Sequence, residues 1–210
     1  MNIKQSFSLV ELIFVIVIIS IISSQFLPKL TKSDLNQAAN KLVIHLKNTK
    51  YQAMIDNKFS HKDDFWFRER WTLKFKNCSK NIGGLYYVVY SDSNHKGSAN
   101  KNETLKDPLT QKWLYSNYDC NASFDESKDI LLTKEYGVSK VEVSCNDTTT
   151  IGQISFGQDG KVYTKLGTKL EDTYNYELKE QCNIVLYDNS NDNVTIIVEP
   201  NTGYIYKKQE

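Results

Sequence analysis

The chain has 210 residues, 40% of them hydrophobic and 12% aromatic, and its 26 Lys and Arg against 25 Asp and Glu leave a formal net charge of +1. A chain so close to neutral lacks the excess of Lys and Arg that a broad electrostatic grip on nucleic acid or acidic lipid requires. This charge balance argues against a strongly basic binding domain, although a local basic patch is still possible. The length is sufficient for a domain with a real hydrophobic core.

The first element is an apolar segment from Phe7 to Leu27 that carries one ionisable side chain, Glu11. As a helix this segment would be about 31 Å long, close to the roughly 30 Å thickness of a membrane's hydrocarbon core. Its Phe, Leu, Ile and Val side chains outweigh the penalty of about 3 kcal/mol for inserting one acid. We therefore expect a transmembrane helix over 7–28, in which the acid has a functional partner.

Two simpler kinds of apolar segment compete with this interpretation. A secretory signal has a shorter apolar core, of about 7 to 15 residues, and a small-residue cleavage site after it, which this chain lacks. A plain signal anchor explains the hydropathy but gives no reason for Glu11 or for Pro28 at their positions. Lysines lie on both sides of the segment, so charge alone does not decide its orientation.

The polar leader with Lys4, then Phe7, then Glu11 as the fifth residue from Phe7, and Pro28 as the 22nd, resembles the signal of type IV pilins and type II secretion pseudopilins. In that family a prepilin peptidase cuts before the Phe and methylates the new amino terminus. The resemblance implies a leader over 1–6, a cut between Ser6 and Phe7, and N-methylation of Phe7. Ser6 departs from the family, which usually has Gly or Ala there.

The same resemblance implies an assembly mechanism and a location. Glu11 would face the α-amino group of a neighbouring subunit, and Pro28 would loosen the helix. The protein would be a single-pass protein of the bacterial inner membrane, with its leader in the cytoplasm and its globular domain in the periplasm, and a filament subunit after assembly. Its partners would be the prepilin peptidase, other pilins or pseudopilins, and an inner-membrane platform protein through which an assembly ATPase acts.

An amphipathic helix over 29–58 is expected to continue the apolar segment. Apolar side chains recur there at helical spacing while lysines lie mostly elsewhere, so one stripe should rest on the globular domain. The residues of this stripe are Leu35, Ala38, Ala39, Leu42, Val43, Leu46, Ala53 and Met54. The sequence thus predicts one long helical rod whose second half packs on the domain.

Residues 59–210 are expected to form a β-rich periplasmic domain. Alternating apolar residues predict strands in WTLKFKN, LYYVVYS and KVEVSC, a hairpin in ISFGQDGKVYT, and a terminal meander through CNIVLYD, VTIIVE and YIYKK. The polar span 91–127 is expected to be a long surface insertion. The predicted fold class is α+β, with a long N-terminal helix, half transmembrane and half amphipathic, packed on an antiparallel β-sheet domain as in pilins.

The order of helix, β region, ISFGQDGKV hairpin and closing strands around VEPNTGYIY resembles the H-type minor pseudopilins, often called the GspH/FimT group. In that group a phrase like F-x-x-D-G precedes the final strands and T-G closes the last hairpin. Another minor pilin or a major subunit remains an open alternative.

Four cysteines lie beyond the apolar segment, at Cys78, Cys120, Cys145 and Cys182, with separations of 42, 25 and 37 residues. In an oxidising periplasm they can form two disulfides, whereas in a reducing setting they would be four free thiols. The absence of any C-x-x-C pair argues against zinc. Three connectivities are possible; we favour Cys78 with Cys120 and Cys145 with Cys182.

Signals for catalysis or cofactors are thin. The sequence has no phosphate loop, no G-x-S-x-G turn and no H-E-x-x-H motif, and His45, His61 and His95 are expected to be surface or rim side chains. Asp188, Asp192 and Glu199 have the spacing of a calcium loop, but Asn193 replaces its glycine and strands flank it, so a hairpin turn is favoured and calcium is left open. We expect no enzymatic activity, cofactor or metal.

The sequence therefore predicts a minor pilin or pseudopilin, a structural subunit of a type II secretion pseudopilus or a type IV pilus. The alternatives are a DNA-uptake pilin, which should carry a basic and aromatic strip on its β domain, and a membrane-tethered periplasmic binding domain, which needs no processing at Ser6.

Overall fold

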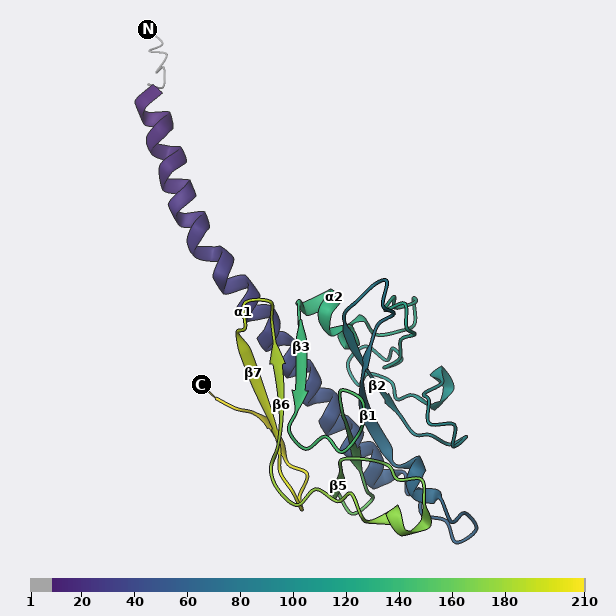
Figure 1. The fold of residues 1–210 in the computed structure, drawn as a ribbon. Coiled ribbons are helices and arrows are strands. Elements are labelled where there is room, and N and C mark those ends of the chain that lie inside the picture. Colours follow the sequence, from purple (N-terminus) through teal and green to yellow (C-terminus); the bar gives the residue numbers. More distant parts are fainter. Residues whose placement is uncertain (1–8, 210) are drawn as a thin grey trace.

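The computed structural model describes the backbone of residues 9–209, and the side chains of these residues except those of 23–33. A helix of 47 residues, α1 (Leu9–Ile55), runs from the free end of the molecule across an α+β domain that holds two antiparallel sheets (Figure 1). A second, short helix, α2 (Leu132–Tyr136), is followed by Gly137, whose positive φ of 67° is the left-handed conformation that glycine adopts without strain.

Each sheet has four strands. The first has the order β2-β1-β4-β5 and the second the order β3-β6-β7-β8, with every neighbouring pair antiparallel. The strands are β1 (Trp71–Asn77), β2 (Leu85–Tyr90), β3 (Lys140–Val143), β4 (Gln153–Phe156), β5 (Val162–Tyr163), β6 (Cys182–Tyr187), β7 (Asn193–Val198) and β8 (Ile205–Lys207). Four 3-10 turns complete the elements: η1 (Trp66–Glu69), η2 (Lys101–Glu103), η3 (Lys128–Ile130) and η4 (Leu170–Thr173).

The strand predictions are confirmed, because all seven expected segments contain strands that pair in the structure. The predicted β4–β5 hairpin forms, and Gly160 in its connecting loop has a φ of 79°, whereas Asp159 does not share this positive φ. The terminal meander β6–β7–β8 also forms as expected. Local alternation and turn chemistry were therefore sufficient to place these strands.

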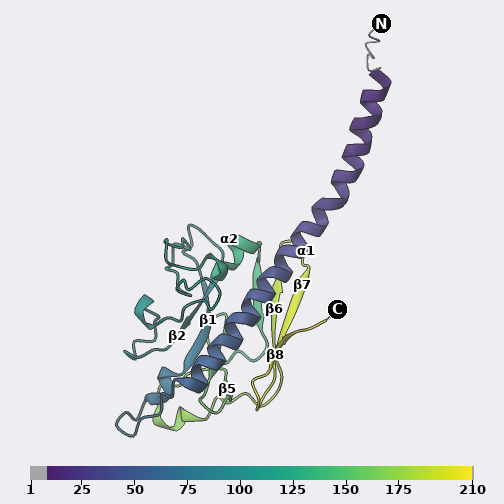
Figure 2. The same ribbon diagram turned by 180° about the vertical axis from the view of Figure 1, so that it is seen from behind.

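The second half of α1 lies across both sheets and covers them, as the view from behind shows (Figure 2). It contacts β1 and β4 of the first sheet and β6, β7 and β8 of the second. Most of the predicted stripe is buried, with relative exposures of 0 to 3%: Leu35, Ala38, Ala39, Leu42, Leu46 and Ala53. Met54 is an exception, because it is 50% exposed.

The predicted transmembrane helix is wrong. Among the residues whose side chains are described, no helix is long and apolar enough to cross a membrane. The membrane-spanning half over 7–28 and the single-pass inner-membrane location are corrected accordingly. The fold is an α+β domain with two antiparallel sheets on a long helix.

The span 91–127 is also more than a surface insertion. Leu114 is fully buried and Cys120 is 4% exposed. The Leu114 carbonyl accepts a hydrogen bond from the Val89 N–H, and the Leu114 N–H donates to the Leu105 carbonyl. The segment therefore extends the first sheet beyond β2 and adds to the core. Its polar composition hid this role, because its order comes from turns and side-chain hydrogen bonds instead of strand alternation.

Candidate functional site

The N-terminal part of α1, residues 9–22, projects away from the sheets, and we call it the stem (Figure 1). Its large apolar side chains are 46 to 75% exposed. They are Leu9, Val10, Leu12, Ile13, Phe14, Val15, Ile16, Val17, Ile18, Ile19, Ile21 and Ile22. A helix that is apolar on every side normally has all its sides covered, and a contiguous apolar surface of this kind marks an interaction site.

The predicted assembly residues fall on or near the stem. Glu11 is exposed in the first turn of α1, where a carboxylate interacts favourably with the positive end of the helix dipole. Pro28 lies within α1, which continues through this position as helix, and its side chain is among those not described. The processing residues Ser6 and Phe7, like the leader 1–6, lie outside the described residues.

The four cysteines form two disulfides, Cys78–Cys120 and Cys145–Cys182, with Cα–Cα distances of 5.6 and 5.3 Å. This is the connectivity that we favoured among the three. The first joins the end of β1 to the span 91–127, and the second joins the segment after β3 to the first residue of β6. Each sheet is thus tied to a neighbouring loop.

A buried polar cluster joins α1 to the first sheet, and no sequence motif indicated it. His45 is fully buried instead of at the surface, and its Nδ1 lies 2.6 Å from the Tyr87 hydroxyl. Its Nε2 lies 3.6 Å from Oδ2 of the fully buried Asp107. The position of His45 next to Leu46 on the buried face of α1 was the available signal.

This cluster has the residue types of a proton relay but no access to a substrate. Burial raises the pKa of Tyr87 well above its ordinary value, so the phenol stays protonated. Burial alone would raise the pKa of Asp107 as well, but contacts with His45, the Leu109 N–H and the Thr110 hydroxyl lower it overall. The cluster therefore anchors α1 to the sheet with a buried charge.

A pocket of about 350 Å³ opens beside the end of β5. One wall is the guanidinium of Arg70, whose Cζ lies 3.6 Å from the Tyr163 ring centre and 5.1 Å from that of Trp66. Its Nη1 donates to the Thr173 carbonyl at 2.8 Å. Because protein groups already hold most of this cation, the pocket offers a ligand mainly aromatic surface.

The calcium-loop spacing does not assemble a calcium site. Asp188 Oδ1 accepts hydrogen bonds from the backbone N–H groups of Ser190 and Asp192, at 2.8 and 3.0 Å, within the β6–β7 turn. Glu199 follows the other end of β7 and accepts a hydrogen bond from the Tyr206 hydroxyl. The favoured hairpin turn is confirmed, since the strand separates the two carboxylates.

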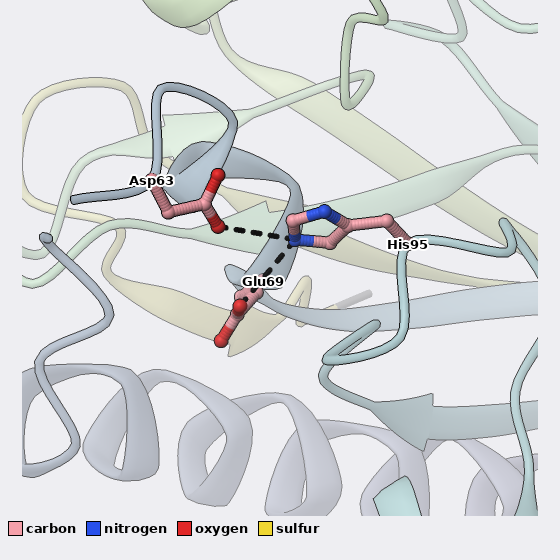
Figure 3. Close-up of side chains that lie close together, drawn as sticks. All are labelled: Asp63, Glu69 and His95. Atoms are coloured by element: carbon pink, nitrogen blue, oxygen red, sulfur yellow. Dashed lines mark ion pairs between the residues drawn. The ribbon is translucent and has the colours of Figure 1, made fainter.

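One group of potential metal ligands does converge, and sequence spacing gave no sign of it. Asp63 precedes η1, Glu69 ends η1, and His95 lies in the loop after β2 (Figure 3). His95 Nε2 is 3.5 Å from Asp63 Oδ2 and 3.3 Å from Glu69 Oε1. One ligand atom from each of the three residues lies within 4.8 Å of the others. We call this group the histidine–carboxylate cluster.

No protein-family model, curated protein or solved structure matches this chain.

Proposed function

We propose that this protein is a non-enzymatic structural subunit of a pilin-like filament, as a minor pilin or pseudopilin. The observation that carries the proposal is the stem, whose large apolar side chains are all exposed. The stem projects away from the two sheets (Figure 1). A helix of this kind fits the centre of a bundle of like helices. The resemblance of Phe7, Glu11 and Pro28 to the pilin signal supports the same assignment.

The energy available from stem packing is large. Complete burial of one Leu, Ile or Val side chain stabilises by roughly 1.5 to 3 kcal/mol. The twelve large stem side chains are each about half exposed or more, so covering them would contribute on the order of 10 kcal/mol per subunit, before the entropic cost of association. This is comparable to the stability of a whole domain.

Glu11 gives the proposed bundle its axial register. Packing of apolar helices is tolerant of sliding, whereas a charge pair fixes one position. Among closely packed apolar stems the effective dielectric constant is lower than in water, so an ion pair with the α-amino group of a neighbouring processed subunit is stronger there. The β domains would then form the outer surface of the filament.

The decisive experiment is the variant Glu11→Ala in a host that carries the filament machinery. We expect normal accumulation and processing but loss of the subunit from sheared filaments, because register is lost. Glu171→Ala is the matched control, since this acid is 68% exposed on the domain surface. Normal incorporation of the Glu11→Ala chain would overturn the charge-pairing role.

Processing gives an independent test of the family assignment. Mass spectrometry of the protein isolated from such a host should find N-methyl-Phe7 as the first residue. Expression in a host that lacks the prepilin peptidase should leave Met1 in place. An unprocessed chain in the presence of the peptidase would contradict the assignment. Incorporation would also require the platform protein and the assembly ATPase of the machine.

A DNA-uptake pilin is the second candidate, and one surface feature favours it. The exposed side of α1 next to β8 presents Tyr51 and Tyr204, 61 and 59% exposed, beside Lys47 and Lys50. Bases stack on aromatic rings while lysines contact phosphates. Binding of single-stranded DNA that weakens with salt and is lost in Tyr51→Ala would favour this candidate; absence of binding would exclude it.

A further inference from the structure

The histidine–carboxylate cluster consists of residue types that commonly bind metal ions, and the proposed filament role does not use it. Its three residues come from two stretches of chain, so their meeting depends on the fold (Figure 3). One imidazole nitrogen and two carboxylate oxygens are the ligand types that zinc takes in sites with three protein ligands and an open fourth position. We propose that Asp63, Glu69 and His95 bind one Zn²⁺ ion.

The distances fit a tetrahedral ion. Zinc bonds to nitrogen and oxygen are about 2.0 to 2.2 Å long, so neighbouring ligand atoms of a tetrahedron lie about 3.3 to 3.6 Å apart. His95 Nε2 lies 3.3 Å from Glu69 Oε1 and 3.5 Å from Asp63 Oδ2. Both measured edges fall within this range. The two carboxylates lie no more than 4.8 Å apart, and small rotations of these side chains would close the third edge.

The nitrogen at the centre of the cluster points to a ligand. Within the described part of the chain, His95 Nε2 is buried and has no hydrogen-bond partner. Both carboxylate oxygens nearest to it approach from one side, as Figure 3 shows. A shared metal ion satisfies the nitrogen and both carboxylates at once. The side chains remain 24 to 34% exposed, which leaves a path for the ion.

Hydrogen bonds to the backbone of His95 and Glu69 position two of the three ligands. The backbone carbonyl of His95 accepts a hydrogen bond of 2.6 Å from Arg68 Nη2. The backbone N–H of His95 donates to the Asp92 carbonyl at 3.1 Å. The Glu69 carbonyl accepts from the Ser91 hydroxyl at 2.7 Å. Contacts of this kind fix the ligands of a metal site before the ion arrives.

Charge also favours a divalent cation. With a neutral imidazole the cluster carries two negative charges, which Zn²⁺ would neutralise. Calcium prefers six to eight oxygen ligands, and magnesium keeps most of its water, so neither suits this small mixed set. Zn²⁺ would replace the direct contacts that His95 makes with the two acids.

Titration of the full chain with Zn²⁺ tests the proposal after removal of metal with a chelator. We expect calorimetry to show one equivalent bound, a rise in the unfolding temperature of about 5 to 10 °C at 100-fold excess over Kd, and no displacement by excess Mg²⁺. His95→Gln should weaken binding by about 100-fold or more. His61→Gln is the matched control, because this exposed imidazole lies close in sequence but outside the cluster.

Cobalt spectroscopy and a second variant keep the test decisive if His95→Gln does not fold. Co²⁺ in the wild-type site should give the intense visible bands of four-coordinate cobalt, and Glu69→Gln should abolish them while the metal-free variant still unfolds in one cooperative transition. Binding that survives Glu69→Gln, binding lost equally in His61→Gln, or no saturable Zn²⁺ binding by the wild type would each overturn the proposal. None of these readouts depends on filament assembly.

Discussion

The two described parts of α1 contain the same kinds of apolar residue and have opposite surroundings. Between residues 34 and 55 most apolar side chains follow one stripe, and Leu42 and Leu46 on that stripe are fully buried against the sheets. In the stem the apolar residues follow one another without a polar face, and Ile16 and Ile18 are 55 and 51% exposed. The striped part packs on one surface, whereas the stem is suited to contacts on every side.

The largest expected effect comes from the disulfides that brace the sheets under the striped part. Replacing Cys145 and Cys182 by Ser opens a loop with a sequence separation of 37 residues. Chain entropy then predicts a loss of about 4 kcal/mol in the free energy of unfolding. Urea unfolding measures it. The Cys78–Cys120 pair, with a separation of 42, should cost nearly the same; a loss under about 1 kcal/mol in either would contradict the entropic argument.

The next effect comes from the buried stripe itself. Leu42→Ala removes a fully buried side chain from the interface of α1 with the sheets, and it should lower the free energy of unfolding by about 3 kcal/mol. Ile18→Ala is the matched control, because it shortens an exposed side chain on the same helix and should change this energy by less than about 0.5 kcal/mol. Equal losses in both variants would erase the distinction between the two parts of α1.

The buried His45 cluster should make the docking of the striped part sensitive to pH. The folded-state pKa of Asp107 lies below its ordinary value of 3.8, so this carboxylate stabilises the fold above that pH, and the contribution is lost as pH falls towards the folded-state pKa. Asp107→Asn should cost roughly 2 kcal/mol at pH 7, and less between pH 4 and 2. Chemical unfolding at several pH values measures the difference. The stability cost of the exposed control Asp119→Asn should not change in this way between pH 7 and pH 2.

The strands were predictable because their signals are local. Alternation in Trp71–Asn77 and the Asp159-Gly160 turn specify their structure within a few residues. The environment of a segment is not local in this sense. An apolar run shows that burial of its side chains is favourable, but it does not show whether lipid or protein covers them. For this reason the stem was predicted to be part of a membrane helix.

Some features of the candidate sites could be predicted from the order of residues in the sequence, and others depend on the fold. Each disulfide joins two consecutive cysteines of the four in the sequence. Asp63, Glu69 and His95 are instead brought together by the return of the chain after β2, which leaves no spacing motif in the sequence. His45 has the polar chemistry of a surface residue, and only its place on the buried face of α1 indicated otherwise.

The smallest effect on stability should accompany the largest effect on association. Ile18→Asn places an amide on the exposed stem, where it removes no contact with the domain, so the free energy of unfolding should change by less than about 0.5 kcal/mol. In a bundle of stems the same amide would be buried without a partner, at a cost of about 1 to 3 kcal/mol in each subunit. Sedimentation of the full chain should therefore show weaker self-association for Ile18→Asn and near wild-type association for Ile18→Leu. If both variants associate like the wild type, the stem is not the surface through which copies of this protein meet, because a buried contact cannot accept an unpaired amide without loss.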